Sequence, residues 1–152
     1  MHDLKALSIK IPRRIIAELI THALEDDPNE CCGLLLGTGD DVDELHRMSN
    51  VNKKPNSRYT MQPGELLEAQ EKVKKSDREF VAIYHSHTFT QGYPSLTDVK
   101  NAVKVSSIST RHVIVSLVEK TRPVVRAFAI DSDSEVTELV IQTDGEPYRA
   151  SD

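Results

Sequence analysis

The 152-residue sequence lacks the features of a secreted or membrane-spanning protein. It has only two cysteines, Cys31 and Cys32, and because a disulfide between adjacent cysteines is strained, they do not indicate an oxidising compartment. No apolar run approaches the length that crosses a bilayer, and the N-terminus shows no signal-peptide pattern. We therefore expect a cytoplasmic protein with no membrane partner.

An excess of positive charge is also absent. Lys and Arg number 19 against 24 Asp and Glu, which gives a formal net charge of −5. Binding to nucleic acid needs a concentrated basic surface, and here the basic residues are scattered among the acids. The sequence therefore predicts no nucleic-acid partner. The proportions of 38% apolar and 28% charged residues are those of an ordinary globular protein, and residues 1–152 are expected to form a single domain, with a homo-oligomer left open.

Short apolar segments interspersed with helical patterns predict an α/β domain with a mixed sheet. The expected strands cover 7–11, 31–36, 42–48, 80–84, 112–117, 124–130 and 136–141, and residues 59–61 are expected to extend the sheet. Helices are expected to begin at Pro12, at Pro63 and near Ser95.

Two of the expected helices have an apolar face. In the first, six residues form a stripe that we expect to be buried: Ile15, Ile16, Leu19, Ile20, Ala23 and Leu24. In the second, four residues are expected to face inward: Leu66, Leu67, Ala69 and Val73. The pairs Glu68–Lys72 and Glu71–Lys75 have the spacing of ion pairs on an exposed helical face.

The segment from His85 to Asp98 holds the residues with the clearest chemistry. His85 and His87 lie two residues apart at the end of an expected strand, so their side chains point to the same side and can converge. Two imidazoles and a carboxylate are a common ligand set for catalytic zinc, which leaves a fourth position for water. The turn between Gly92 and Pro94 can bring Asp98 back to the histidines. The pattern indicates an open catalytic site rather than a closed structural one.

The same residues also have a purely structural interpretation. Histidines two apart on a strand occur without a metal, and Ser95 and Asp98 have the spacing of a capping box at a helix N-terminus. For Ser95 the capping role and a chemical role can coexist, because a residue at a helix start is held rigidly. For Asp98 they are expected to compete, since a metal-bound carboxylate cannot also cap freely. Taken alone, this spacing favours the cap.

Glu30 is the candidate general base, the group that takes a proton from the attacking water. It stands at the mouth of an expected apolar strand, where partial burial would raise the pKa of its carboxyl group. The alternative is a surface acid that follows Asp26 and Asp27, and spacing alone favours that alternative. Cys31 and Cys32 are interpreted as core-strand residues. The remaining histidines carry no spacing argument and are interpreted as structural or surface residues: His2, His22, His46 and His112.

Taken together, these residues resemble the JAMM (MPN+/Mov34) family of zinc metalloproteases. The family motif is a Glu before an x-Cys-Gly strand, then His-x-His, seven residues, Ser, two residues and Asp. The sequence matches every spacing with Glu30-Cys31-Cys32-Gly33, His85-Ser86-His87, Ser95 and Asp98. The resemblance covers nearly the whole chain. One departure is Thr88, where the family commonly has proline, and it bears on loop rigidity rather than on metal binding.

The resemblance implies one zinc ion held by His85, His87 and Asp98, with Glu30 as general base toward the zinc-bound water and Ser95 stabilising the oxyanion. It implies a curved mixed sheet flanked by helices, related to zinc deaminases. The compact chain looks most like stand-alone prokaryotic members that process ubiquitin-like or sulfur-carrier proteins. The implied activity is peptidase or isopeptidase cleavage after a C-terminal Gly-Gly tail, and the choice between a lysine isopeptide and a C-terminal cysteine adduct stays open.

Other functions fit the sequence less well. A non-catalytic MPN scaffold that binds a protein partner is the main alternative, although such relatives usually lack one or more ligands. A zinc nucleoside deaminase would need His-x-Glu and Pro-Cys-x-x-Cys, and neither occurs. A binuclear hydrolase would need Asp and His where Phe89 and Thr90 stand. A structural zinc site lacks its fourth protein ligand. Whether the loop Thr88–Pro94 inhibits the site is left open.

Overall fold

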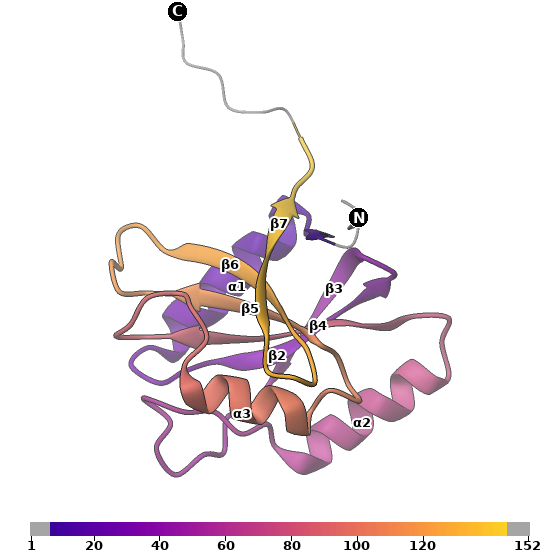
Figure 1. Ribbon diagram of the computed structural model, residues 1–152, viewed down its shortest axis with the longest axis horizontal. Coiled ribbons are helices and arrows are strands. Elements are labelled where there is room, and N and C mark those ends of the chain that lie inside the picture. The colour runs from indigo at the N-terminus through magenta and orange to yellow at the C-terminus, as the bar shows by residue number, and fades with distance from the viewer. Residues whose placement is uncertain (1–6, 146–152) are drawn as a thin grey trace, which may run out of the picture.

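The computed structural model describes residues 7–145, and the strands of this part form one mixed sheet (Figure 1). They are β1 (Ser8–Lys10), β2 (Cys32–Thr38), β3 (Asp41–Met48), β4 (Glu79–His87), β5 (Arg111–Ser116), β6 (Val124–Ile130) and β7 (Val136–Gln142). Their order is β1-β3-β2-β4-β5-β6-β7, and β1 pairs with both β3 and β7. The expected curved mixed sheet is confirmed, and its curvature is strong enough to close it into a barrel.

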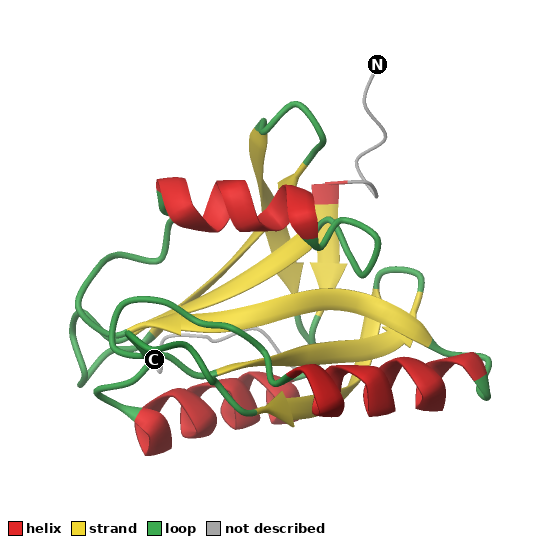
Figure 2. Ribbon diagram, turned by 90° about the horizontal axis from the view of Figure 1, so that it is seen from below, coloured by secondary structure: helices red, strands yellow, loops and turns green. Residues whose placement is uncertain are grey.

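Three helices complete the described part of the chain: α1 (Arg13–Asp26), α2 (Pro63–Lys74) and α3 (Leu96–Lys104). In Figure 1, α2 and α3 lie below the strands and α1 lies behind β5 and β6, and in Figure 2 helices cover the strands from two sides. Strands β4 and β5 are parallel, so the chain must cross between their opposite ends, and α3 lies in that crossover. The expected α/β class and the three helix starts are confirmed, and α1 itself begins just after Pro12.

The apolar stripe of α1 is buried as expected over most of its length. Ile15, Leu19 and Ala23 are fully buried against the sheet, and these residues follow one another at intervals of four. Leu24 is 44% exposed, so its expected burial is wrong. Its side chain projects about 100° around the helix from that of Ala23, which places it off the buried face.

Helix α2 packs Ala69 against residues of β2 and β4. Leu67 is 59% exposed rather than buried, because it lies off the face that Leu66, Ala69 and Val73 share. The two ion pairs expected within α2 are also replaced by others. The Nζ atom of Lys72 lies 3.1 Å from Oε1 of Glu44 on β3, and that of Lys74 lies 3.6 Å from Oε1 of Glu71.

Residues 59–61 do not extend the sheet, contrary to expectation. Met61 forms a single isolated antiparallel bridge with Asn50, and the N–H of Val51 donates to the carbonyl of Thr60 at 2.9 Å. These contacts bring together the two ends of the loop between β3 and α2. The apolar residues here close a loop instead of joining a ladder, because the pairing stops at this single bridge.

Tyr84 fixes α1 to the middle of β4. Its hydroxyl lies 2.7 Å from Nδ1 of His22 in the buried interior. Its ring covers Gly33 on β2, where an added Cβ would lie 2.3 Å from Cε1 of the ring. Only glycine therefore fits at position 33 with this ring in place. Because neighbouring residues on a strand point to opposite faces, the same β4 presents His85 on the side away from α1.

No helix of residues 7–145 has both the length and the apolar composition needed to span a membrane. The single-domain expectation for residues 1–152 extends beyond this range at both ends, and His2 also lies outside the described residues.

Candidate metal centre

Strand β4 carries both histidines on one side. The strand continues to His87, three residues beyond its expected end, so the two residues lie within the sheet rather than after it. His85 pairs with Ile114 of β5, and His87 pairs with Ser116, which holds the backbone of both in a regular ladder. Their Nε2 atoms lie 3.1 Å apart. The expected convergence of the two imidazoles is confirmed.

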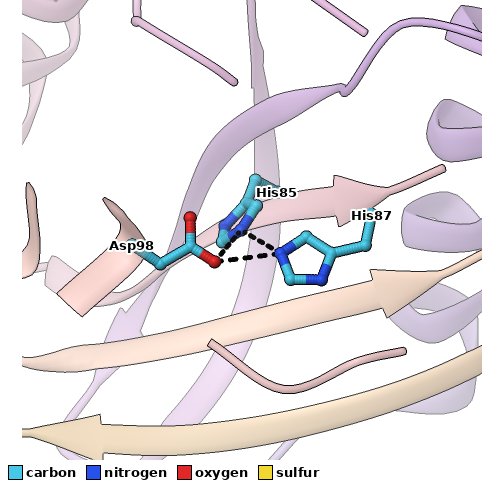
Figure 3. Close-up of side chains that lie close together, drawn as sticks. All are labelled: His85, His87 and Asp98. Carbon is cyan, nitrogen blue, oxygen red and sulfur yellow. Dashed lines mark hydrogen bonds and ion pairs between the residues drawn. The ribbon is translucent and has the colours of Figure 1, made fainter. Parts of the chain in front are cut away.

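Asp98 joins them from the first turn of α3, as Figure 3 shows. Its Oδ2 atom lies 2.9 Å from Nε2 of His87 and 3.2 Å from Nε2 of His85. The same oxygen accepts a hydrogen bond from the N–H of Ser95 at 2.9 Å and completes the capping box of α3. The cap is therefore confirmed. One carboxylate oxygen both caps α3 and faces the histidines, and the expected competition between capping and metal binding stays a prediction.

The three atoms have the chemistry and spacing of a metal-binding triad. Ligands of tetrahedral zinc lie about 2.0–2.2 Å from the metal and so roughly 3.3–3.6 Å from one another. The three observed separations run from 2.9 to 3.2 Å, so a small outward movement would admit the ion. His85 and His87 are buried, and Asp98 is mostly buried. Within the described residues, this is the group of His, Cys, Asp or Glu residues whose ligand atoms converge in this way.

The two imidazole rings are oriented by different contacts. Nδ1 of His87 lies 2.7 Å from the carbonyl oxygen of Gln91, so Nδ1 carries the proton and Nε2 offers its lone pair to the centre. Nδ1 of His85 is buried and has no hydrogen-bond partner among the described residues. The His85 ring instead stacks on Tyr59, with centroids 4.5 Å apart and planes 24° apart. Neither Gln91 nor Tyr59 had a recognisable sequence signal, because both lie in loops without periodicity.

Charge and burial act against each other at this centre. Burial lowers the pKa of His87, but the hydrogen bonds to Asp98 and to the Gln91 carbonyl, with the nearby negative charges, together raise it more, so the net shift is upward. Burial raises the pKa of Asp98, and the opposing effects of His85, His87 and the Ser95 N–H bring it well below its usual range. Asp98 is therefore a carboxylate at neutral pH, the form that binds metal.

Glu30 lies at the entrance to β2 and is only 6% exposed, so the surface-acid alternative is wrong. Burial raises the pKa of its carboxyl group, against the opposing charges of the two histidines. Its N–H donates to the carbonyl of Pro55 at 2.7 Å, and its own carbonyl accepts from Nδ2 of Asn50 at 3.0 Å. The following N–H, that of Cys31, donates to the buried hydroxyl of Ser86 at 2.8 Å. The backbone around Glu30 is thus fixed to the strand that carries the histidines.

Ser95 is exposed at the N-terminus of α3. Its Oγ atom accepts a hydrogen bond from the N–H of Asp98 at 3.0 Å. No described residue accepts a bond from its hydroxyl, so the O–H can be donated to another group. The capping role of Ser95 is confirmed, and its chemical role stays a prediction.

Thr88, which stands where proline was expected, is buried and bonded. Its hydroxyl donates to the carbonyl of Asn56 at 3.2 Å. Two residues further on, the carbonyl of Thr90 accepts from the hydroxyl of Ser116 at 2.6 Å. These bonds restrain the exit from β4, a task that a proline ring would perform through its fixed φ angle.

The remaining cysteines and histidines are not among the converging ligand atoms. Cys31 and Cys32 are fully buried free thiols, as expected for core residues. Burial raises the pKa of Cys31 to about 12, so it is an unreactive thiol at neutral pH. His22 and His112 are also buried, whereas His46 is half-buried.

Comparison with known proteins agrees with the resemblance to the JAMM family. Residues 12–131 match the family model described as prokaryotic homologs of the JAB domain. The chain is 37% identical over 126 residues to the CysO-cysteine peptidase of Mycobacterium tuberculosis, covering 82% of this chain and 83% of that protein. It is 34% identical over 90 residues to the desampylase of Haloferax volcanii, covering 55% of this chain and 65% of that protein.

Solved structures share the fold. A protein from Desulfitobacterium hafniense superposes with a TM-score of 0.74 at 30% identity, covering 91% of this chain and 94% of that one. A structure described as a JAMM metalloprotease-like zinc site in the proteasome and signalosome gives 0.54 at 19% identity, covering 89% and 98%, and shows the fold alone. The fold is that of a JAB/MPN (JAMM-type) domain. The chain belongs to the family of prokaryotic homologs of the JAB domain, and the resemblance read from its motif is confirmed.

Proposed function

We propose that this protein is a zinc-dependent peptidase or isopeptidase that cleaves after the C-terminal Gly-Gly tail of a ubiquitin-like or sulfur-carrier protein. The observation that carries the proposal is the convergence of two imidazole nitrogens and one carboxylate oxygen near a buried Glu30. The relatives named a CysO-cysteine peptidase and a desampylase support the activity class and the kind of substrate. His85, His87 and Asp98 would hold the metal.

Zinc bound at such a site polarises a water molecule and a substrate carbonyl. Glu30 would accept the proton of the attacking water and pass it to the leaving amine. Its burial suits both steps, because a raised pKa makes the carboxylate a stronger base and the carboxylic acid a proton donor nearer neutral pH. Ser95 would donate its free O–H to the oxygen that becomes negative, while Asp98 N–H holds its Oγ in place.

A pair of matched conjugates tests the activity and the substrate class. One β-grasp protein ending in Gly-Gly is joined either to the ε-amine of a lysine peptide or to a C-terminal cysteine. Zinc-loaded wild-type protein is expected to cleave at least one of them after the second glycine, detected by mass spectrometry. Chelator-treated protein is expected to cleave neither, and the Glu30→Gln variant, the matched control, is expected to cleave either one only far more slowly than wild type.

Failure of the zinc-loaded protein on both conjugates would remove the proposed substrate class. If the protein then still bound the β-grasp protein with measurable affinity, the non-catalytic scaffold would become the better description. Cleavage of only one conjugate would decide between the isopeptide and the cysteine adduct.

A further inference from the structure

Asn50, which follows β3, has a side chain that is bonded on every side. Its Nδ2 donates to the carbonyl oxygens of Glu30 and Arg58, each at 3.0 Å. Its Oδ1 accepts from the N–H groups of Asn52 and Thr60, also at 3.0 Å each. A primary amide has two N–H donors and one acceptor oxygen, so the full capacity of the group is used. One side chain thereby joins the segment of Glu30 to the loop that follows β3.

Two of these hydrogen bonds hold the peptide groups on either side of Tyr59. The carbonyl before it and the N–H after it are both bound by the Asn50 amide. The ring of Tyr59 in turn stacks on His85. Because Nδ1 of His85 has no hydrogen-bond partner in the described part of the chain, its ring is oriented by this stacking together with the contacts of its Nε2 atom at the centre. His87 differs, since its Nδ1 is fixed by the carbonyl of Gln91.

We propose that Asn50 is a positioning residue that sets Glu30 and His85 relative to each other. It acts on Glu30 through that residue's carbonyl group and on His85 through Tyr59. The effect on Glu30 rests on the proposed function, whereas the effect on His85 concerns metal binding alone. When a residue that orients a metal ligand without binding the metal is removed, metal affinity or activity typically falls 10–100-fold. Glu30 lies just before β2 and His85 lies on β4, so a bond between their supports fixes one relative to the other.

The stacking contact is tested by zinc affinity, measured by competition with a chromophoric chelator. Tyr59→Leu removes the ring, and we expect zinc to bind about tenfold more weakly. Tyr59→Phe is the matched control, because the hydroxyl has no hydrogen-bond partner among the described residues, and its zinc affinity should stay within twofold of wild type. Unchanged zinc affinity in Tyr59→Leu would overturn the role of the stacked ring.

The Asn50→Asp substitution tests Asn50 itself, because it keeps the shape of the side chain and removes both of its N–H donors. We expect zinc affinity and kcat each to fall about tenfold or more, with KM little changed. The added negative charge alone would strengthen zinc binding, so a loss cannot be a charge effect. Asn52→Ala is the control in the same loop, since Asn52 bonds Thr60 and Lys54 but not Glu30. If Asn50→Asp and Asn52→Ala lost zinc affinity and kcat equally, Asn50 would only help the loop to fold. The same would follow if Asn50→Asp lowered thermal stability alone.

A double variant shows whether Asn50 acts through Glu30. In the Glu30→Gln background, Asn50→Asp should lower the residual kcat far less than it lowers that of wild type, because the group it positions is gone. If Asn50→Asp lowered kcat by the same factor in both backgrounds, the link to Glu30 would be overturned. If wild-type protein cleaves neither conjugate, the proposed function fails, and the zinc titrations of the Tyr59 and Asn50 variants still decide the effect on His85.

Discussion

Strand β4 separates two clusters in which an imidazole faces a carboxylate. In the α1 cluster (His22, Asp26 and Tyr84), Nε2 of His22 lies 3.2 Å from Oδ2 of Asp26, and Nδ1 lies 2.7 Å from the Tyr84 hydroxyl. In the metal cluster (His85, His87 and Asp98), a second imidazole points its Nε2 atom at the same carboxylate oxygen. Both clusters place histidine beside aspartate, and they differ in how many ring nitrogens meet.

That number decides what each cluster can do. In the α1 cluster each ring nitrogen has its own partner, so a neutral imidazole is satisfied by hydrogen bonds. Burial lowers the pKa of His22 despite the nearby Asp26, which favours this neutral form. In the metal cluster two nitrogens and one oxygen share one point, and a cation there would satisfy all three lone pairs. Convergence of ring nitrogens, rather than a histidine–carboxylate pair, therefore marks the metal site.

The largest expected effect separates the clusters by zinc content. His85→Ala removes one of three converging donors and should lower bound zinc from about one per chain to none, measured by elemental analysis after dialysis. His22→Ala is the matched control, and it should keep its zinc while losing stability. Zinc retained by the His85 variant, or lost equally from both, would show that the clusters do not differ as their geometry indicates.

The second prediction concerns turnover. Glu30→Gln keeps the size of the side chain and removes the base, so the cleavage rate should fall about 10²–10⁴-fold with zinc content unchanged. Asp26→Asn is the control from the α1 cluster, and its rate should stay within a few-fold of wild type. A Glu30 variant with a near-normal rate would remove that residue from the mechanism.

The sequence was sufficient to predict the features that depend on local spacing. Alternation along a strand places His85 and His87 on one side, and Ser95 and Asp98 have the spacing of a helix cap. Both features need only a few residues of regular backbone. The family motif then linked them to Glu30. Spacing alone did not indicate that Glu30 is buried.

Features that depend on distant contacts could not be predicted. The barrel closes because the three residues of β1 pair with β7, more than a hundred positions away, and no local pattern encodes that pairing. The support of His85 comes from Tyr59 in an irregular loop, where side-chain direction follows no period. Asp98 shows a further limit, because its spacing did not indicate that a single carboxylate oxygen would both cap the helix and face the histidines.

His112 is a third case to compare with the two clusters. It is a buried histidine whose Nε2 has no hydrogen-bond partner among the described residues. Burial lowers its pKa to about 4, so the fold favours the neutral form. Stability from this residue is complete above the unfolded pKa of about 6.5 and is lost as pH falls toward 4, by about 3 kcal/mol in all. The free energy of unfolding in urea, measured without metal, should therefore decline more over this range in wild type than in His112→Leu. Parallel pH profiles would contradict this.

The smallest expected effect tests whether the two sides of β4 are independent. Tyr84→Phe keeps the ring that covers Gly33 and removes the hydroxyl that faces His22. Leaving Nδ1 of His22 buried without a partner should lower the free energy of unfolding by about 1–2 kcal/mol. Zinc affinity should not change, because His85 points away from this hydroxyl on the opposite face of the strand. A tenfold weaker zinc affinity in Tyr84→Phe would mean that the α1 cluster helps to hold β4 in the position that metal binding requires.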